Sequence, residues 1–142
     1  PLLAIIGSGP ETPQLPNKPN IVHLGKKNHT EVQTYIANAI SVIIPSICYE
    51  GFPLVVAEAY TLGKPVIARD IGPLSELVQH EKTGALYQSE HIDLASALDY
   101  VQKNQLKLTS NIKKEQMRQC SCEPNIKSLI NIYERVLSEN HA

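Results

Sequence analysis

The chain has 142 residues, of which 42% are hydrophobic and 19% are charged, and its formal net charge at pH 7 is −1. This length fits one domain with a core of its own, and the balance of residue types is that of a globular protein. Lys and Arg are scattered, which argues against a nucleic-acid-binding surface, and no apolar run is long enough for a membrane-spanning helix.

The cysteines and the N-terminus bear on the location of the protein. The chain has an odd number of cysteines, without the spacing of a disulfide framework: Cys48, Cys120 and Cys122. We therefore expect free thiols in a reducing, cytoplasmic setting, and neither disulfides nor a zinc site. The N-terminus lacks the basic segment and cleavage site of a signal peptide. Because the chain opens directly on an apolar run, we expect that preceding sequence is missing.

The first part of the chain predicts two strands joined by a proline-rich loop. Residues 2–6 form a continuous apolar run, as in a parallel strand that is buried on both faces. Prolines at every third position exclude a helix over residues 10–19, so an extended loop is expected there. Residues 20–24 form the next strand, which ends at Gly25. Within it, His23 is interpreted as a packing residue and not as a catalytic base.

A helix and a third strand follow. The pattern Thr30-Glu-Val-Gln33 matches a capping box, and apolar residues then recur at helical spacing as far as Ile40. Residues 41–45 form another apolar strand.

The most informative stretch is residues 44–68, which reads as strand end, glycine turn, helix, glycine stop and next strand. Pro53 stands where the first helical residue is expected, and Gly63 stands where the helix would end. Two carboxylates, Glu50 and Glu58, lie eight positions apart within it. A helix N-terminus at the carboxyl end of a parallel strand binds anions. The stretch therefore predicts a phosphate-bearing ligand with two acids close to it.

The remainder continues the alternation of strands and helices. Strands are expected over residues 65–69 and 83–87, and helices over residues 74–80, 92–103, 109–119 and 124–139. The last helix has a clear apolar face, and Tyr133 on that face is interpreted as a core residue. Strands that alternate with helices throughout predict an α/β fold with a parallel, doubly wound sheet.

Ordered motifs over nearly the whole chain resemble the donor-binding half of a GT-B glycosyltransferase of the retaining family 4 type. Glu50 to Glu58 resembles that family's Glu-x7-Glu motif, and Ile5-Ile-Gly-Ser-Gly-Pro10 resembles its first strand and Gly-x-Gly-Pro turn. The pattern continues in Val22-His-Leu-Gly25, Leu62-Gly-Lys-Pro-Val-Ile-Ala68, Gly72, Glu76, Val78, Thr83-Gly84 and Ile132-Tyr133. The resemblance implies a Rossmann-like, three-layer α/β/α domain over residues 1–142, without its first strand and without the N-terminal acceptor domain.

The resemblance also implies a site for a UDP-, GDP- or ADP-sugar. In the family, the first Glu of the motif lies against the donor sugar and the second binds the ribose, which assigns these roles to Glu50, the catalytic candidate, and Glu58. Backbone N–H groups of Phe52, Leu54 and Val55 would face the diphosphate and the sugar, with no metal and no cofactor. The other donor-binding candidates are Gly51, Pro53, Gly7, Gly9 and Lys26.

Two departures from the family pattern bear on this site. Many members have Gly at the position of Pro53, and proline has no N–H to donate, so this position bears on which sugar is bound. The family supplies an Arg and a Lys for the diphosphate from a segment before the strand at residues 2–6, and that segment is not in this chain. We therefore expect the isolated chain to bind a donor weakly and to be inactive. The full enzyme would act in polysaccharide, lipid or glycan synthesis, and a membrane surface is a further expected partner for it.

Other readings stay open beside this one. A non-catalytic nucleotide-sugar-binding module and an epimerase-type GT-B relative fit the same motifs. A receiver-type signalling module would need an acid pair before Asp70, Asp93 or Asp99, and a metal-dependent GT-A enzyme would need Asp-x-Asp; the sequence has neither. Gly7 and Gly9 can be read as a simple strand-end turn, and Lys26 as a solvated side chain.

Overall fold

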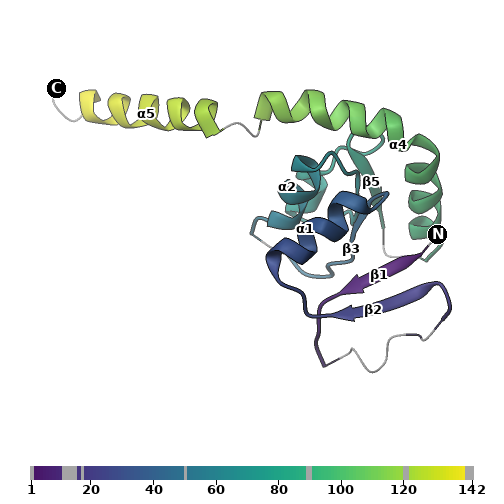
Figure 1. The fold of residues 1–142 in the computed structure, drawn as a ribbon. Coiled ribbons are helices and arrows are strands. Elements are labelled where there is room, and N and C mark those ends of the chain that lie inside the picture. The colour runs from purple at the N-terminus through teal and green to yellow at the C-terminus, as the bar shows by residue number, and fades with distance from the viewer. Residues whose placement is uncertain are drawn as a thin grey trace. The chain divides into compact units, whose positions relative to one another are not determined.

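The computed structural model describes residues 2–10, 16, 18–49, 51–88, 91–119 and 122–139. The chain divides into two compact units, Pro1–Ala39 and Ile40–Ala142, and each is described by itself. Strands alternate with helices from the second strand (Ile21–Gly25) to the helix His91–Gln119, and all the described strand pairs are parallel (Figure 1). The predicted α/β class with parallel strands is confirmed. That residues 1–142 act as one domain stays a prediction.

The first unit contains two parallel strands and one helix. Strand β1 (Leu3–Ile6) pairs with β2 (Ile21–Gly25), and the two run side by side in Figure 1. The N–H of Gly7 donates to the carbonyl oxygen of Gly25 at 2.9 Å, so both strands end at the same edge. The predicted proline loop falls mostly outside the described residues. His23 was predicted to pack, but it is exposed and its Nε2 lies 3.3 Å from the carbonyl oxygen of Pro16.

Helix α1 (His29–Asn38) starts two residues earlier than predicted, because a different residue forms its cap. Oδ1 of Asn28 accepts the N–H of Glu31 at 2.9 Å, and the carboxylate of Glu31 accepts the N–H of Asn28 at 3.0 Å. The capping box therefore begins at Asn28, and Thr30 lies inside the helix. Asparagine caps a helix as well as threonine does, and a glutamate in the first turn also interacts favourably with the helix dipole.

The second unit contains a three-stranded parallel sheet. Its strands, in the spatial order β3-β4-β5, are β3 (Val42–Ile44), β4 (Val66–Arg69) and β5 (Gly84–Tyr87). The central strand β4 has no exposed surface at Val66, Ile67 and Ala68. Because consecutive strand residues point to opposite faces, both faces of β4 are covered. Its neighbours are α2 (Leu54–Thr61), α3 (Pro73–Leu77) and α4 (His91–Gln119), as expected for a Rossmann-like domain.

Helix α4 is a single helix, where the sequence predicted two helices over residues 92–103 and 109–119. The core of the unit contains Leu108 of α4 together with Val101 and Ile67. Thr109 Oγ1 also donates to the carbonyl oxygen of Gly63 at 3.0 Å. The residues between the two predicted helices include neither Gly nor Pro, so the helix continues and brings Leu108 into the core.

Two other predicted helices differ in their bounds. Helix α3 ends at Leu77, and His80, which was predicted to be its last residue, forms a β-bridge with Gly84. Helix α5 (Cys122–Glu139) begins two residues before Pro124. Proline is tolerated there because the first turn of a helix does not use its N–H groups.

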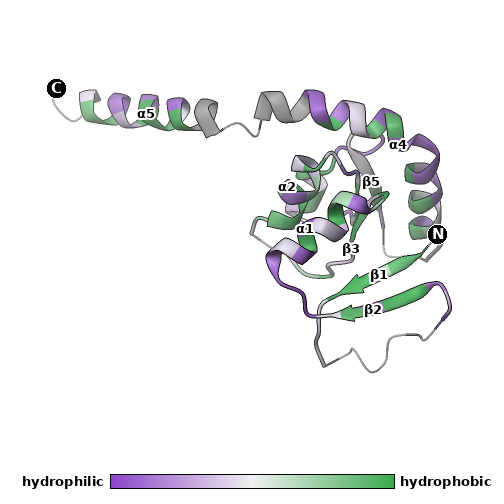
Figure 2. Ribbon diagram, in the orientation of Figure 1, coloured by the Kyte–Doolittle hydropathy of each residue, from purple (hydrophilic) through white to green (hydrophobic). Residues whose placement is uncertain are grey.

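The predicted apolar face of α5 is present, but it is exposed. Figure 2 shows green apolar and purple polar residues alternating around this helix. The exposed apolar side chains are Ile126, Leu129, Ile130, Ile132, Tyr133, Val136 and Leu137. The prediction that Tyr133 is a core residue is wrong, since 63% of its surface is exposed. In the described part of the chain, no helix has both the length and the apolar content to cross a membrane.

Candidate functional site

The N-terminus of α2 lies at the centre of the predicted site. The helix follows β3, and Pro53 is its N-cap residue, with φ −74° and ψ 95°. The prediction that Pro53 is the first helical residue was therefore one position too early, since the helix begins at Leu54. The carbonyl oxygen of Pro53 accepts the N–H of Val56 at 3.0 Å. The first helical N–H groups are those of Leu54 and Val55, and an α-helix provides no internal partner for such groups.

One face of α2 packs into the core and another is presented outward. Val56 and Ala59 are buried, and Pro53 is buried at the start of the helix. Leu54 is exposed, and Glu58 is half-buried. Since residues four apart lie on the same face of a helix, Glu58 stands one turn after Leu54 on the outward side. The backbone donors at the N-terminus and the carboxylate of Glu58 are therefore held by one short, well-packed element.

The C-terminus of α2 is closed as the sequence predicted. Gly63 has φ +67°, a left-handed conformation that glycine adopts without strain. Its N–H donates to the carbonyl oxygen of Tyr60 at 2.8 Å, and the N–H of Lys64 donates to that of Ala59 at 2.8 Å. These two bonds form a Schellman motif, which fixes where α2 stops and where the chain turns toward β4.

Exposed apolar side chains gather in sequence around the start of α2. Ile47, Tyr49, Phe52 and Leu54 have between 58% and 79% of their surface exposed. The sequence analysis assigned Phe52 and Leu54 to the site only through their N–H groups, and it did not include Ile47 and Tyr49 among the candidates. Single exposed apolar residues are ordinary, but a contiguous group of them is typical of a binding surface, so these four side chains are candidates for ligand contact. The sequence offered one signal for Ile47 and Tyr49 as candidates, which is that aromatic and aliphatic residues occupy a segment interpreted as a turn.

The candidates of the first unit lie at the carboxyl ends of β1 and β2. Gly7 is hydrogen-bonded to Gly25, the residue before Lys26. A Cβ atom at Gly7 or Gly9 would meet nothing within 4 Å, so a ligand has room to approach this backbone. Lys26 is exposed, whereas its neighbour Lys27 forms an ion pair with Glu31 at 3.2 Å. The structure therefore places Gly7, Gly9 and Lys26 at one edge of the β1–β2 pair.

Some of the predicted site residues cannot be placed. Glu50 lies outside the described residues, and the next residue, Gly51, is exposed. Cys48 is an exposed free thiol, as predicted, while Cys120 and the side chain of Cys122 are not described. Among the side chains that are described, no three of the types His, Cys, Asp and Glu come together in a way that could hold a metal ion.

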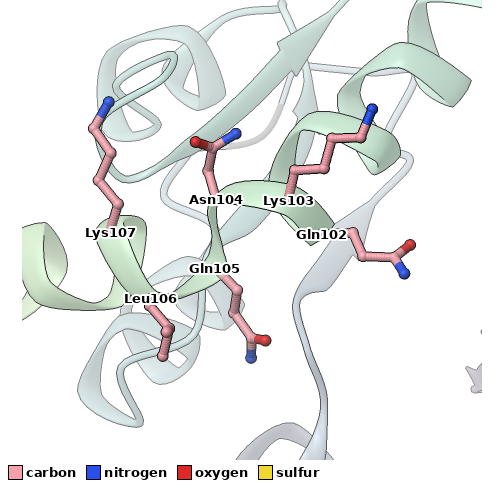
Figure 3. Close-up of a pocket in the computed structure, with 6 residues that line it drawn as sticks. All are labelled: Gln102, Lys103, Asn104, Gln105, Leu106 and Lys107. Carbon is pink, nitrogen blue, oxygen red and sulfur yellow. The ribbon is translucent and has the colours of Figure 1, made fainter.

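A hollow of about 440 Å³ on the surface of α4 is not a second site. It is lined by Gln102, Lys103, Asn104, Gln105, Leu106 and Lys107 (Figure 3). Six consecutive residues pass around the whole circumference of an α-helix, because one turn takes 3.6 residues. Their side chains point in different directions in Figure 3 and do not converge on one ligand.

The comparison with known proteins decides the family. Residues 2–119 match the family model described as "Glycosyl transferases group 1". The chain belongs to this family. An uncharacterized glycosyltransferase of Methanocaldococcus jannaschii is 30% identical over 125 residues, which is 85% of this chain and 32% of the relative. The putative teichuronic acid biosynthesis glycosyltransferase TuaC of Bacillus subtilis is 39% identical over 77 residues, 54% of this chain and 19% of TuaC.

A solved structure shows the same fold. HepE from Anabaena, in complex with UDP and glucose, superposes with a TM-score of 0.74 at 20% identity, over 94% of this chain and 40% of HepE. The predicted resemblance to this glycosyltransferase family is confirmed, and the fold is that of a GT-B glycosyltransferase domain. The chain spans about a third or less of the length of the curated relatives named above. Membership of family 4 in particular stays a prediction.

Proposed function

We propose that this chain is the donor-binding part of a retaining, metal-independent glycosyltransferase and that its ligand is a nucleotide-diphospho sugar. The observation that carries the proposal is the N-terminus of α2. Leu54 and Val55 present N–H groups at the carboxyl-end side of β3, within the segment that matches the glycosyltransferase family. An anion-binding helix end at this place in a parallel sheet is what a diphosphate requires.

The chemistry of sugar transfer fits these groups. The reaction breaks the bond between the anomeric carbon and the diphosphate oxygen, so positive charge develops on the sugar and negative charge on the departing diphosphate. A helix N-terminus carries roughly half a positive elementary charge. The N–H groups of Leu54, Val55 and Phe52 meet the negative charge in this proposal, together with the exposed backbone of Gly51. Such preorganised donors stabilise the leaving group without a metal ion.

The two carboxylates have different roles in the proposal. A carboxylate accepts hydrogen bonds from hydroxyl groups, which both the ribose and the sugar provide. Glu58 binds the ribose, and its partial burial strengthens these bonds because water competes less there. Glu50 lies against the donor sugar. Gly7, Gly9 and Lys26 provide further donor contacts, and Pro53 influences the choice of sugar because it offers no N–H.

The acceptor and the remaining machinery belong to the rest of the full-length protein. Relatives several times as long as this chain support an additional acceptor domain. The name of TuaC supports a polysaccharide as acceptor. UDP is the first nucleotide to test among UDP, GDP and ADP, because the solved relative HepE was found with it. The cationic residues for the diphosphate, the cytoplasmic location and any membrane contact are proposals for the full enzyme.

Titration of the 142-residue chain with UDP-glucose, GDP-mannose and ADP-glucose tests the proposal, by calorimetry or ligand-observed NMR on a sample shown to be folded. We expect weak binding of one nucleotide class, which Glu58→Gln weakens. Glu134→Gln removes the same charge from the exposed surface of α5 and should leave binding unchanged. A folded chain that binds none of the three would contradict the proposal. Product analysis with the full-length protein separates transfer with retention from the epimerase and non-catalytic alternatives.

A further inference from the structure

Tyr49 and Gly72 make a contact that joins two loops at the carboxyl ends of neighbouring strands. Tyr49 lies between β3 and α2, and Gly72 lies between β4 and α3. A Cβ atom at Gly72 would lie 2.6 Å from Cδ1 and 3.2 Å from Cε1 of the Tyr49 ring. The ring therefore occupies the space that any other residue at position 72 would need. Gly72 also has φ +50° and ψ −136°, a conformation that is strained for every residue except glycine.

The two sides of this contact differ in how firmly they are held. Gly72 is followed by Leu74 and Val78, which are buried, and its carbonyl oxygen accepts the N–H of Ser75 at 3.1 Å. The Tyr49 side chain, in contrast, has 79% of its surface exposed and lies in a segment with exposed neighbours. One edge or face of the ring thus rests on a firmly packed turn, and the remainder faces outward.

We propose that Tyr49 is a positioning residue for donor binding and that it acts through Gly72. Tyr49 is joined by one planar peptide bond to Glu50, the residue assigned above to the donor sugar. When the ring rests on Gly72, the backbone before Glu50 is held against the turn that follows β4. Small displacements of a positioned group weaken its interactions strongly, so this contact sets the affinity for the sugar part of the donor. The inference rests on the proposed function.

The ring contact itself is tested without a ligand. An aromatic ring over a glycine shifts the NMR resonances of the glycine α-protons. We expect the Gly72 α-proton resonances to be shifted from their ordinary position in the wild type and in Tyr49→Phe, and to return toward that position in Tyr49→Ala. Unshifted Gly72 resonances in the wild type would show that the contact is absent in solution and would overturn the inference.

Its role is tested by comparing the Kd of a nucleotide sugar with the Kd of its free nucleotide, using UDP-glucose with UDP, GDP-mannose with GDP and ADP-glucose with ADP. Tyr49→Ala should raise the Kd of the nucleotide sugar by about 5- to 100-fold and leave that of the nucleotide within about twofold. Tyr49→Phe keeps the ring and should keep both values.

The outcomes separate this inference from the proposed function. If the wild type binds a nucleotide sugar and Tyr49→Ala binds it equally well, the positioning role is wrong and the proposed function stands. The same holds if Tyr49→Ala weakens the nucleotide and the nucleotide sugar to the same extent, because that is the effect of a general structural role. If the wild type binds neither, the proposed function fails and this inference fails with it.

Discussion

The phenol oxygen of Tyr60 lies 2.8 Å from the hydroxyl oxygen of Thr83, and both side chains are buried. The Tyr60 oxygen also lies 3.2 Å from the carbonyl oxygen of Leu77, and the N–H of Gln79 donates to the Thr83 oxygen at 3.0 Å. These hydrogen bonds form a chain in which every group has a partner. Gln79 donates to Thr83, Thr83 donates to Tyr60, and Tyr60 donates to Leu77. Since Tyr60 belongs to α2, this network fixes the helix of the candidate site to the segment that precedes β5.

Tyr60→Phe is expected to lower the free energy of unfolding by about 1–3 kcal/mol, because Leu77 and Thr83 lose a partner that water cannot readily replace. Urea unfolding of both proteins measures the difference. Tyr35→Phe is the matched control, since Tyr35 is a partly exposed residue of α1, and it should change stability by less than about 0.5 kcal/mol. Equal losses in the two variants would show that the buried network contributes no specific stability.

Leu108→Ala is expected to destabilise the second unit by about 2–5 kcal/mol, because Leu108 has no exposed surface and its truncation leaves a cavity between α4 and the sheet. Leu106→Ala makes the same chemical change two residues away, where 87% of the side chain is exposed. We expect that control to stay within about 0.5 kcal/mol of the wild type. A similar loss in both variants would mean that the second half of α4 does not pack as described.

The course of α4 shows what the sequence could and could not predict about the fold. Strands and most helices were predictable because apolar runs, glycine stops and proline positions act locally. The stretch around Leu108 has no strong periodicity, so its continuity as helix was not apparent. Its position depends on the space between β5 and α2, which local patterns do not encode. The capping residue of α1 was misplaced because Asn28 and Thr30 both satisfy the same local rule.

The candidate site, like the fold, could be predicted from the sequence only in part. The boundaries of α2, including the left-handed Gly63, were predictable from residue types alone. The contact of Tyr49 with Gly72 was not, because the two residues are far apart in sequence and meet only once β3 and β4 are paired. Burial also escaped the sequence reading, as the exposed Tyr133 shows. An apolar helical face in the sequence does not indicate which part of a protein, if any, packs against it.

Gly84→Ala is expected to prevent normal pairing of β4 with β5. A Cβ atom at Gly84 would lie 1.9 Å from the carbonyl oxygen of Val66, its partner in the parallel register, and this backbone cannot move without disturbing the sheet. We expect a loss of more than about 3 kcal/mol or no folded protein, seen as poor dispersion of amide NMR signals. Gly9→Ala, where a Cβ meets nothing within 4 Å, should fold as the wild type does. A well-dispersed spectrum with unchanged stability for Gly84→Ala would contradict the strand register.

Glu31 makes the stability of the first unit depend on pH. The N–H of Asn28, and then the ammonium group of Lys27, hold the pKa of the Glu31 carboxyl below its ordinary value. A carboxyl whose pKa is lower in the folded state contributes stability above its unfolded pKa, and this is lost as the pH falls through the folded pKa. The protection factors of the α1 amides, which are hydrogen-exchange rates corrected for the intrinsic pH dependence of exchange, should therefore decrease in the wild type as the pH falls below about 5. Glu31→Gln should lack this pH-dependent loss of stability, and identical pH profiles for the two proteins would contradict the prediction.

The division of roles between Glu50 and Glu58 gives the sharpest test of the site. Glu58→Ala should weaken a free nucleotide and its nucleotide sugar alike, because both carry the ribose, whereas Glu50→Ala should weaken only the nucleotide sugar. Each lost charged hydrogen bond is worth about 1.5–3 kcal/mol, or roughly 10- to 150-fold in Kd. Removing a ribose hydroxyl from the ligand provides the complementary change. If Glu58 accepts that hydroxyl, a deoxynucleotide should bind the wild type more weakly than the nucleotide does. Glu58→Ala should then bind the two ligands equally well. Additive losses from the two changes would instead assign the ribose to another residue.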